Sequence, residues 1–144
     1  MSRAAAPVRA DFRYWQRFTT RWADNDAYGH VNNTVYYQWF DSLVNQWLIE
    51  RDLLDIGQGD PIALVVATDC QFFSSTAYPG QIDAGLAATE VGSSSVRYRI
   101  GIFAAGDENA AAAGHFVHVA VTRTGRRPTP WPDAWRVALR DLLI

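Results

Sequence analysis

One long amphipathic helix is predicted in a chain whose other segments are almost all strand-like, and this combination limits the folds available. From Val35 onward, apolar residues recur with the i, i+3, i+4 and i+7 spacing of one helix face, and polar residues separate them. The apolar set consists of Tyr36, Trp39, Phe40, Leu43, Val44, Trp47 and Leu48. A face this wide has to be buried against another element of the fold. Asn32 or Asn33 is the predicted N-cap of the helix.

Most of the remaining chain has the composition and alternation of β-strands. The predicted strands are 12–22 before the helix and 62–74, 81–91, 95–105 and 111–123 after it. The turn 106–109 predicts a hairpin between the last two strands, and Asp133 is predicted to cap a short helix that ends at Leu143. Because strands joined by short turns pair antiparallel, the sequence predicts an α+β fold, in which a curved antiparallel sheet of about five or six strands wraps around one long central helix.

Length and composition indicate one folded domain. The chain has 144 residues, of which 49% are hydrophobic and 13% aromatic, so it can bury a core and is too apolar for a disordered protein. Residues 1–10 are small and include Pro7, and we expect them to form a flexible tail. Residues 11–144 are expected to form the single domain, because no internal repeat or second boundary is present.

Charge and cysteine content argue against several classes of function. The net charge is −2 and the 13 basic residues, all arginine, are spread along the chain, so no nucleic-acid binding is predicted. The single cysteine, Cys70, excludes an internal disulfide, and no cysteine and histidine set has the spacing of a zinc site. No segment approaches the roughly 20 apolar residues of a membrane helix, and the N-terminus lacks an apolar export signal. We therefore expect a cytoplasmic protein with no metal and no membrane association.

The segment 21–33, directly before the long helix, has the composition of an active-site loop. It holds two carboxylates, a turn glycine, a histidine and, at its end, two consecutive asparagines. Loops held between rigid elements often carry catalytic residues, and a helix N-terminus offers unpaired backbone N–H groups that can bind an oxyanion. From the residues alone, the carboxylate of Asp26 is still more readily explained as a capping or ion-pairing group.

Three residues of this loop, Asp24, Asp26 and Gly29, have the spacing Asp-x-Asp-x-x-Gly, and the segment 29–33 continues as Gly-His-Val-Asn-Asn before Tyr36. With this motif the chain resembles the hotdog-fold acyl-CoA thioesterases of the 4-hydroxybenzoyl-CoA thioesterase type. The segments 78–81 and 92–95 resemble two turns of the same family, although Gln81 stands where the family usually has an acidic residue. The resemblance therefore extends over most of the chain and reinforces the hotdog fold as the expectation.

The resemblance implies an enzyme that hydrolyses an acyl-CoA thioester to a carboxylic acid and free coenzyme A. Coenzyme A is then part of the substrate, and no other cofactor and no metal is implied. Asp26 would be the catalytic carboxylate, as nucleophile or as general base, and a main-chain N–H at Asn33 or Thr34 would bind the oxyanion, assisted by the helix dipole. Because a thiol ionises at a pKa of about 8.5, the thiolate leaves without a strong general acid, so few catalytic groups suffice.

Other residues of the motif have less specific expected roles. Gly29 would allow the substrate to approach the backbone closely, although an ordinary turn glycine is equally compatible with the pattern. Thr34 and Tyr36 would contact the substrate. His30 could orient a water molecule or the substrate carbonyl, with a hydrogen-bonding strut as an equal alternative. Asp24 is expected to be structural, bonding loop N–H groups or the preceding arginine.

Substrate identity is not determined by the motif. An acyl tunnel and a plain core are both compatible with the aromatic residues Trp39, Phe40, Phe72, Phe73 and Tyr98. Coenzyme A phosphates and solvent are both compatible partners of the arginines Arg97, Arg99, Arg123, Arg126 and Arg127. Asp41, on the polar side of the helix, is a reserve candidate for the catalytic carboxylate.

Two alternative functions stay open from the sequence. An acyl carrier protein thioesterase would use the same bond chemistry with a different carrier, and a non-catalytic acyl-CoA-binding module would keep the fold without turnover. The resemblance also implies a homodimer or homotetramer with the active sites at the subunit interface.

Overall fold

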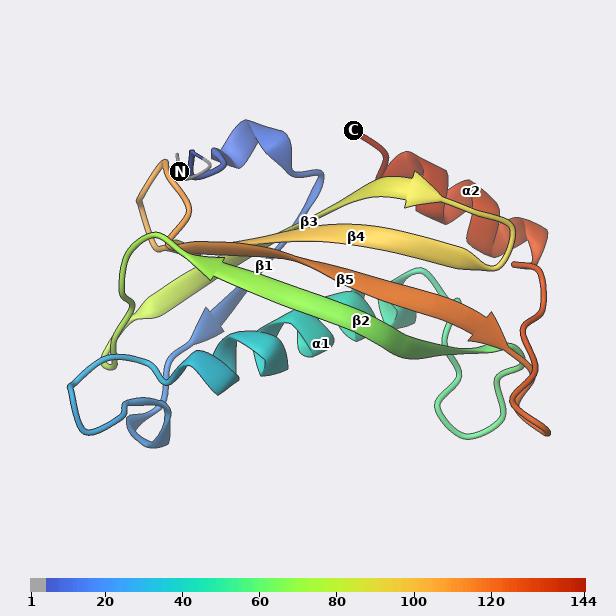
Figure 1. The fold of residues 1–144 in the computed structure, drawn as a ribbon, viewed down its shortest axis with the longest axis horizontal. Helices are drawn as coiled ribbons and strands as arrows, with labels where there is room; N and C mark the ends of the chain where they lie inside the picture. Colours follow the sequence, from blue (N-terminus) through green and yellow to red (C-terminus); the bar gives the residue numbers. More distant parts are fainter. Residues whose placement is uncertain (1–4) are drawn as a thin grey trace.

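The computed structural model describes residues 5–144, and these residues form one antiparallel sheet with a long helix on one face (Figure 1). The strands are β1 (Tyr14–Thr19), β2 (Ile62–Phe72), β3 (Gln81–Val91), β4 (Ser95–Ala104) and β5 (Ala112–Val121). The helices are α1 (Asn33–Glu50) and α2 (Asp133–Asp141), with short 3-10 turns at Arg9–Asp11 and Trp22–Asp24. This is the predicted α+β hotdog arrangement, with five strands. No helix among the described residues is long and apolar enough to cross a membrane.

Helix α1 lies against the sheet through the face that the periodicity predicts. All seven predicted apolar residues are buried, together with Val35 at the start of the helix. They belong to one cluster with inward-facing residues of β3, β4 and β5 and with Trp135 and Leu139 of α2. The N-cap is Asn32, whose side chain accepts a hydrogen bond from the backbone N–H of Thr34. The predicted helix is confirmed, and the burial of its apolar face explains why it forms.

The strand order, β1-β3-β4-β5-β2, differs from the expectation that consecutive strands pair. The predicted hairpin of β4 and β5 is confirmed, but β2 pairs with β5 and lies at one edge, whereas β3 pairs with β1 and β4. The connection 73–80 crosses from the β2 edge to the other side of the sheet instead of making a tight turn. As a result, residues 73–80 pass close to the start of α1.

Two element boundaries also differ from the expectation. Strand β1 is shorter than the predicted 12–22, because Phe12 packs on the sheet and Trp22 begins a 3-10 turn. Pro132 occupies the N-cap position of α2, so Asp133 is its first residue and makes no capping bond, and the helix ends at Asp141.

The N-terminal segment packs on the sheet face opposite α1 (Figure 1). Residues 1–4 of the expected flexible tail lie outside the described residues, but Pro7 accepts a bond from the Ala110 N–H and Val8 pairs with Asn109. Further on, the ring of Phe12 lies over Gly85 and Gly101, where a Cβ atom would come within 2.8 and 2.6 Å of it. The segment from Pro7 onward is therefore part of the domain rather than a loose tail.

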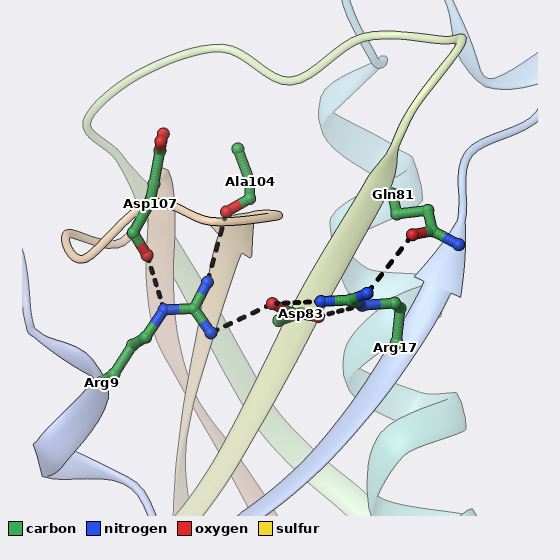
Figure 2. Close-up of polar contacts among 6 residues, drawn as sticks. All are labelled: Arg9, Arg17, Gln81, Asp83, Ala104 and Asp107. Atoms are coloured by element: carbon green, nitrogen blue, oxygen red, sulfur yellow. Dashed lines mark hydrogen bonds and ion pairs between the residues drawn. The ribbon is translucent and has the colours of Figure 1, made fainter.

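Asp83 holds this segment in place through two arginines (Figure 2). Arg9 lies 3.0 Å from one carboxylate oxygen of Asp83, and Arg17 of β1 donates to the other at 2.7 Å. The bond from Arg17, followed by that from Arg9, lowers the pKa of the Asp83 carboxyl group. Arg9 also donates to the carbonyl groups of Ala104 and Asp107, so it links the N-terminal segment to the β4–β5 hairpin.

Candidate active site

The loop before α1 is a compact turn built on backbone hydrogen bonds. The Asp26 N–H donates to the His30 carbonyl at 2.8 Å, and the Gly29 N–H donates to the Asp26 carbonyl at 3.1 Å. Gly29 has φ of +81°, which favours glycine because it lacks a Cβ atom. Asn25 and Val31 form a bridge across the base of the turn. The turn therefore presents residues 26–30 beside the helix start.

Contacts with the distant segment 73–80 fix the position of this loop. The side-chain amide of Asn25 donates to the Tyr78 carbonyl at 3.3 Å and accepts from the Tyr78 N–H at 2.9 Å. The Val31 N–H donates to the Thr76 carbonyl at 2.9 Å, and the hydroxyls of Tyr36 and Thr76 are 2.7 Å apart. Asn25 and Thr76 were not identified from the sequence, because no local pattern links residues about 50 positions apart.

Asp24 is a structural residue of the loop. Its side chain is only 1% exposed, and it accepts bonds from the Arg21 main-chain N–H and guanidinium group at 2.8 to 3.0 Å. The Asp24 carbonyl accepts from the Asn32 N–H at 2.8 Å. These contacts agree with the structural interpretation of Asp24 and connect the first turn of the loop to the helix cap.

A cavity of about 530 Å³ opens between the loop, the start of α1 and the end of β2. Its lining consists of Asp26, His30, Val31, Asn32, Asn33, Tyr36, Phe72, Phe73, Ser74 and Ser75. The structure thus brings four of the six predicted site residues into one cavity, while Gly29 and Thr34 are not part of its wall. Ser74 and Ser75 were not identified from the sequence, since their place depends on the crossover after β2.

Asp26 lines this cavity, and one of its two carboxylate oxygens is hydrogen-bonded. Its Oδ1 atom accepts a hydrogen bond from the Tyr28 N–H at 2.8 Å. Its Oδ2 atom has no hydrogen-bond partner within residues 5–144, and the side chain is partly buried. One oxygen therefore orients the side chain and the other is available to a water molecule or a substrate. His30 is exposed, and no side-chain bond holds it to Asp26 in the described part of the chain.

The helix start distinguishes the two candidate oxyanion donors. The Thr34 N–H donates to the Asn32 side chain at 3.0 Å, and the Thr34 hydroxyl donates to the same oxygen at 2.8 Å. The Asn33 N–H, in contrast, has no acceptor among the described residues. Because the first N–H groups of a helix lack intrahelical partners, the Asn33 N–H remains available at the positive end of the helix dipole.

Tyr36 is mainly a structural part of the cavity wall. It is 2% exposed, its hydroxyl is bonded to Thr76, and its ring packs edge-on against Trp39 and Phe72. Burial raises the pKa of Tyr36, which excludes it as a base near neutral pH.

Several residues that the sequence offered for an acyl tunnel or for the catalytic carboxylate lie outside this cavity. Of the aromatic residues considered for an acyl tunnel, Phe72 and Phe73 line the cavity, whereas Trp39, Phe40 and Tyr98 are buried in the core. Asp41 is exposed on α1 beside a different cavity, and its carboxylate accepts from the Asn45 amide at 3.1 Å.

Neither a cluster of metal ligands nor a reactive thiol is found within residues 5–144. No group of three or more histidine, cysteine, aspartate or glutamate side chains within residues 5–144 is arranged to hold a metal ion. Burial raises the pKa of the Cys70 thiol to about 12, so this thiol stays protonated near neutral pH.

Comparison with known proteins identifies the family. The family model of the thioesterase-like superfamily matches residues 20–139. The crystal structure of the PA5185 protein from Pseudomonas aeruginosa strain PAO1 is 46% identical, covers 96% of each chain and superposes with a TM-score of 0.93. A 1,4-dihydroxy-2-naphthoyl-CoA thioesterase from Synechocystis is 22% identical and shares the fold, with a TM-score of 0.80 over 90% of this chain and 96% of that chain.

A gentisyl-coenzyme A thioesterase also shares the fold, at 23% identity and a TM-score of 0.76 over 88% of this chain and 99% of that chain. No curated protein sequence matches the chain. The family model covers the loop, α1, the cavity wall and all strands after α1. The chain belongs to the thioesterase-like superfamily and has its hotdog fold, and the chemistry of that family is thioester hydrolysis.

Proposed function

We propose that this protein hydrolyses acyl-CoA thioesters at the cavity beside the α1 N-terminus, with Asp26 as the catalytic carboxylate. One observation carries the proposal. The Asp26 Oδ2 atom and the Asn33 N–H, which have no hydrogen-bond partner among the described residues, belong to residues that line the same cavity. Hydrolysis of a thioester needs an attacking oxygen and a donor for the charge that develops on the carbonyl. In this proposal Asp26 supplies or activates the attacking oxygen, and the Asn33 N–H is the donor to the carbonyl oxygen.

The proposed chemistry requires little from the rest of the site. The free Asp26 oxygen either removes a proton from the attacking water or attacks the carbonyl to form an anhydride that water then cleaves. The Asn33 N–H stabilises the oxyanion in both routes. The coenzyme A thiolate is a good leaving group because its thiol has a pKa of about 8.5, so the cavity needs no dedicated acid. His30, exposed on the cavity rim, would contact the substrate.

Thiol release from a panel of acyl-CoAs tests this function. We expect measurable turnover of at least one aromatic or aliphatic acyl-CoA, because Phe72 and Phe73 form an apolar part of the wall. The same acyl groups presented on acyl carrier protein are the matched comparison. A clear preference for the carrier protein would replace the coenzyme A proposal, and tight acyl-CoA binding without turnover over hours would contradict hydrolysis altogether.

We also propose that the active form is a homodimer joined at the β2 edge. Strand β2 has 11 residues, lies at the edge of the sheet and carries exposed apolar side chains, with Val65 44% and Val66 61% exposed. A long edge strand of this kind is a template for pairing with another strand, and natural monomers normally protect such edges. The catalytic cavity reaches Phe72 at the end of β2, so a partner at this edge would lie next to the site. A homotetramer would be two such dimers.

Charge placed on the β2 edge tests the dimer. We expect Val66→Lys to reduce the mass in solution from a multiple of the 16.1 kDa chain mass to a single chain, measured by light scattering. Val137→Lys on α2 is the matched control, because Val137 is 63% exposed and lies away from β2. A wild-type chain that is monomeric, or a Val66→Lys variant that keeps the wild-type mass, would contradict an interface at this edge.

A further inference from the structure

The side chain of Asn25, directly before Asp26 in the chain, bonds to a segment about 50 residues away. Its Oδ1 atom accepts from the Tyr78 N–H at 2.9 Å, and its Nδ2 atom donates to the Tyr78 carbonyl at 3.3 Å. An amide that binds both main-chain groups of one residue fixes the orientation of that residue as well as its distance. Among the described residues, no other side chain of the loop 25–30 forms a hydrogen bond beyond the loop.

Tyr78 is a firm attachment point, because the segment around it is bonded to the end of β1. Thr20 follows β1 and is only 2% exposed. Its N–H donates to the Gly80 carbonyl at 2.9 Å, and its hydroxyl lies 3.0 Å from the same carbonyl and 3.2 Å from that of Ala77. Asn25 therefore connects the loop to a part of the domain that the sheet holds in place.

The bonds inside the loop fix its shape but do not fix its position. The Asp26 N–H bonds to the His30 carbonyl and the Asp26 Oδ1 atom to the Tyr28 N–H, so these contacts move with the loop. The Asn33 N–H, in contrast, belongs to α1, which the core packing holds. The distance between the Asp26 Oδ2 atom and the Asn33 N–H consequently depends on the contacts of the loop with the rest of the domain.

Two neighbouring contacts with the segment 73–80 hold the base of the loop. Asn25 and Val31 form the bridge across this base. The Val31 N–H donates to the Thr76 carbonyl at 2.9 Å, and Asn25 binds Tyr78 two residues further along. One such contact leaves the loop able to pivot, whereas two contacts on the same segment fix its orientation. The Asn25 contact is the one made by a side chain, and it lies next to Asp26.

Asn25 acts on the site without being part of the cavity wall, to which Asp26 belongs. We propose that Asn25 is a positioning residue, whose two bonds to Tyr78 set the place of the Asp26 carboxylate relative to the Asn33 N–H. This inference rests on the proposed acyl-CoA hydrolysis. A catalytic group displaced by about 1 Å can lose about 10²-fold in rate, so a loop that pivots would be costly.

Replacing Asn25 with alanine removes both bonds to Tyr78. We expect Asn25→Ala to lower kcat by about 10- to 100-fold, with KM within about twofold of the wild type because the side chain does not line the cavity. The melting temperature should fall by no more than about 5 °C. The matched control is Asn45→Ala, which loses two side-chain bonds to Asp41, at 2.8 and 3.1 Å, and should keep kcat within about twofold.

A double-mutant cycle with Asp26→Asn shows whether Asn25 acts through Asp26. Once the carboxylate is absent, its position no longer matters, so Asn25→Ala should change kcat by less than about twofold in the Asp26→Asn background. A general weakening of the fold would lower kcat by the same factor in both backgrounds. Asn25→Gln, which keeps the amide but is one methylene longer, is the second variant if Asn25→Ala does not fold. We expect it to lower kcat by about threefold or more.

The same series separates a failure of this inference from a failure of the proposed function. A wild type without turnover, or Asp26→Asn with the wild-type rate, would reject the proposed site and the role of Asn25 together. If Asp26→Asn loses its activity while Asn25→Ala keeps the wild-type kcat, only the role of Asn25 is overturned. A loss confined to KM, an equal loss in both backgrounds of the cycle, or an equal effect of Asn45→Ala would overturn it as well.

Discussion

Replacing Asp26 with asparagine is expected to lower kcat for thioester hydrolysis by about 10²- to 10⁴-fold, the range typical of a lost general base. An amide cannot accept a proton from water at neutral pH and is not a nucleophile, so it removes both proposed roles of the carboxylate. The amide oxygen can still accept the bond from the Tyr28 N–H, which holds Asp26 at 2.8 Å in the wild type. The loop and the melting temperature should therefore be preserved, and KM should change little.

Asp41→Asn is the matched control for this experiment. Asp41 is the other carboxylate considered for catalysis, it lies on the exposed side of α1, and an asparagine there can still accept from Asn45. We expect its kcat to stay within about twofold of the wild type, as for a surface substitution away from the site. If Asp26→Asn keeps most of the wild-type rate while Asp41→Asn loses it, the catalytic carboxylate is on the helix and the proposed site is wrong.

Acid is expected to destabilise the protein between about pH 6.5 and pH 4 through one buried histidine. His118 of β5 is 2% exposed, packs between the rings of Tyr98 and Phe116, and has no bond to its Nδ1 atom in the described residues. Burial lowers the pKa of His118 from about 6.5 to about 4. The unfolded chain therefore binds a proton on this residue over a pH range in which the folded chain does not.

The sign of the effect follows from this difference in proton binding. Stability that depends on neutral His118 is fully present above the unfolded pKa and is lost as the pH falls toward the folded pKa. The gap between the two pKa values corresponds to about 3 kcal/mol in the free energy of unfolding. Denaturant unfolding at several pH values between 4 and 7 measures it.

His118→Phe removes the titrating group and keeps a ring of similar shape in the aromatic cluster. We expect the stability of this variant to depend much less on pH between 4 and 7, while the carboxylates still act at lower pH. Because the pKa of Asp83 is lowered, its protonation changes the free energy of unfolding only at pH values below the normal titration range of aspartate. Asp83 therefore does not account for a loss of stability near pH 5. Parallel pH profiles for the wild type and His118→Phe would show that His118 does not contribute this dependence.

The elements of this fold were largely predictable because their signals are local. The period of the apolar residues in α1, the alternation in β4 and the turn between β4 and β5 all concern residues a few positions apart. The partner of β2 was not predictable in this way, because pairing with β5 joins segments separated by two other strands in the chain. Which edge receives a strand depends on the path of the connection 73–80, and this path has no local sequence signal.

The sequence by itself determined the central helix, the α+β class and the family resemblance, and it placed the candidate carboxylate Asp26 next to a helix start. The tertiary structure decided that the Asn33 N–H rather than the Thr34 N–H is available, because the Asn32 cap uses the latter. It also decided that the segment after β2 forms part of the cavity wall. Periodicity and capping act over a few residues, whereas a cavity is formed by side chains and backbone groups that only the folded sheet brings together.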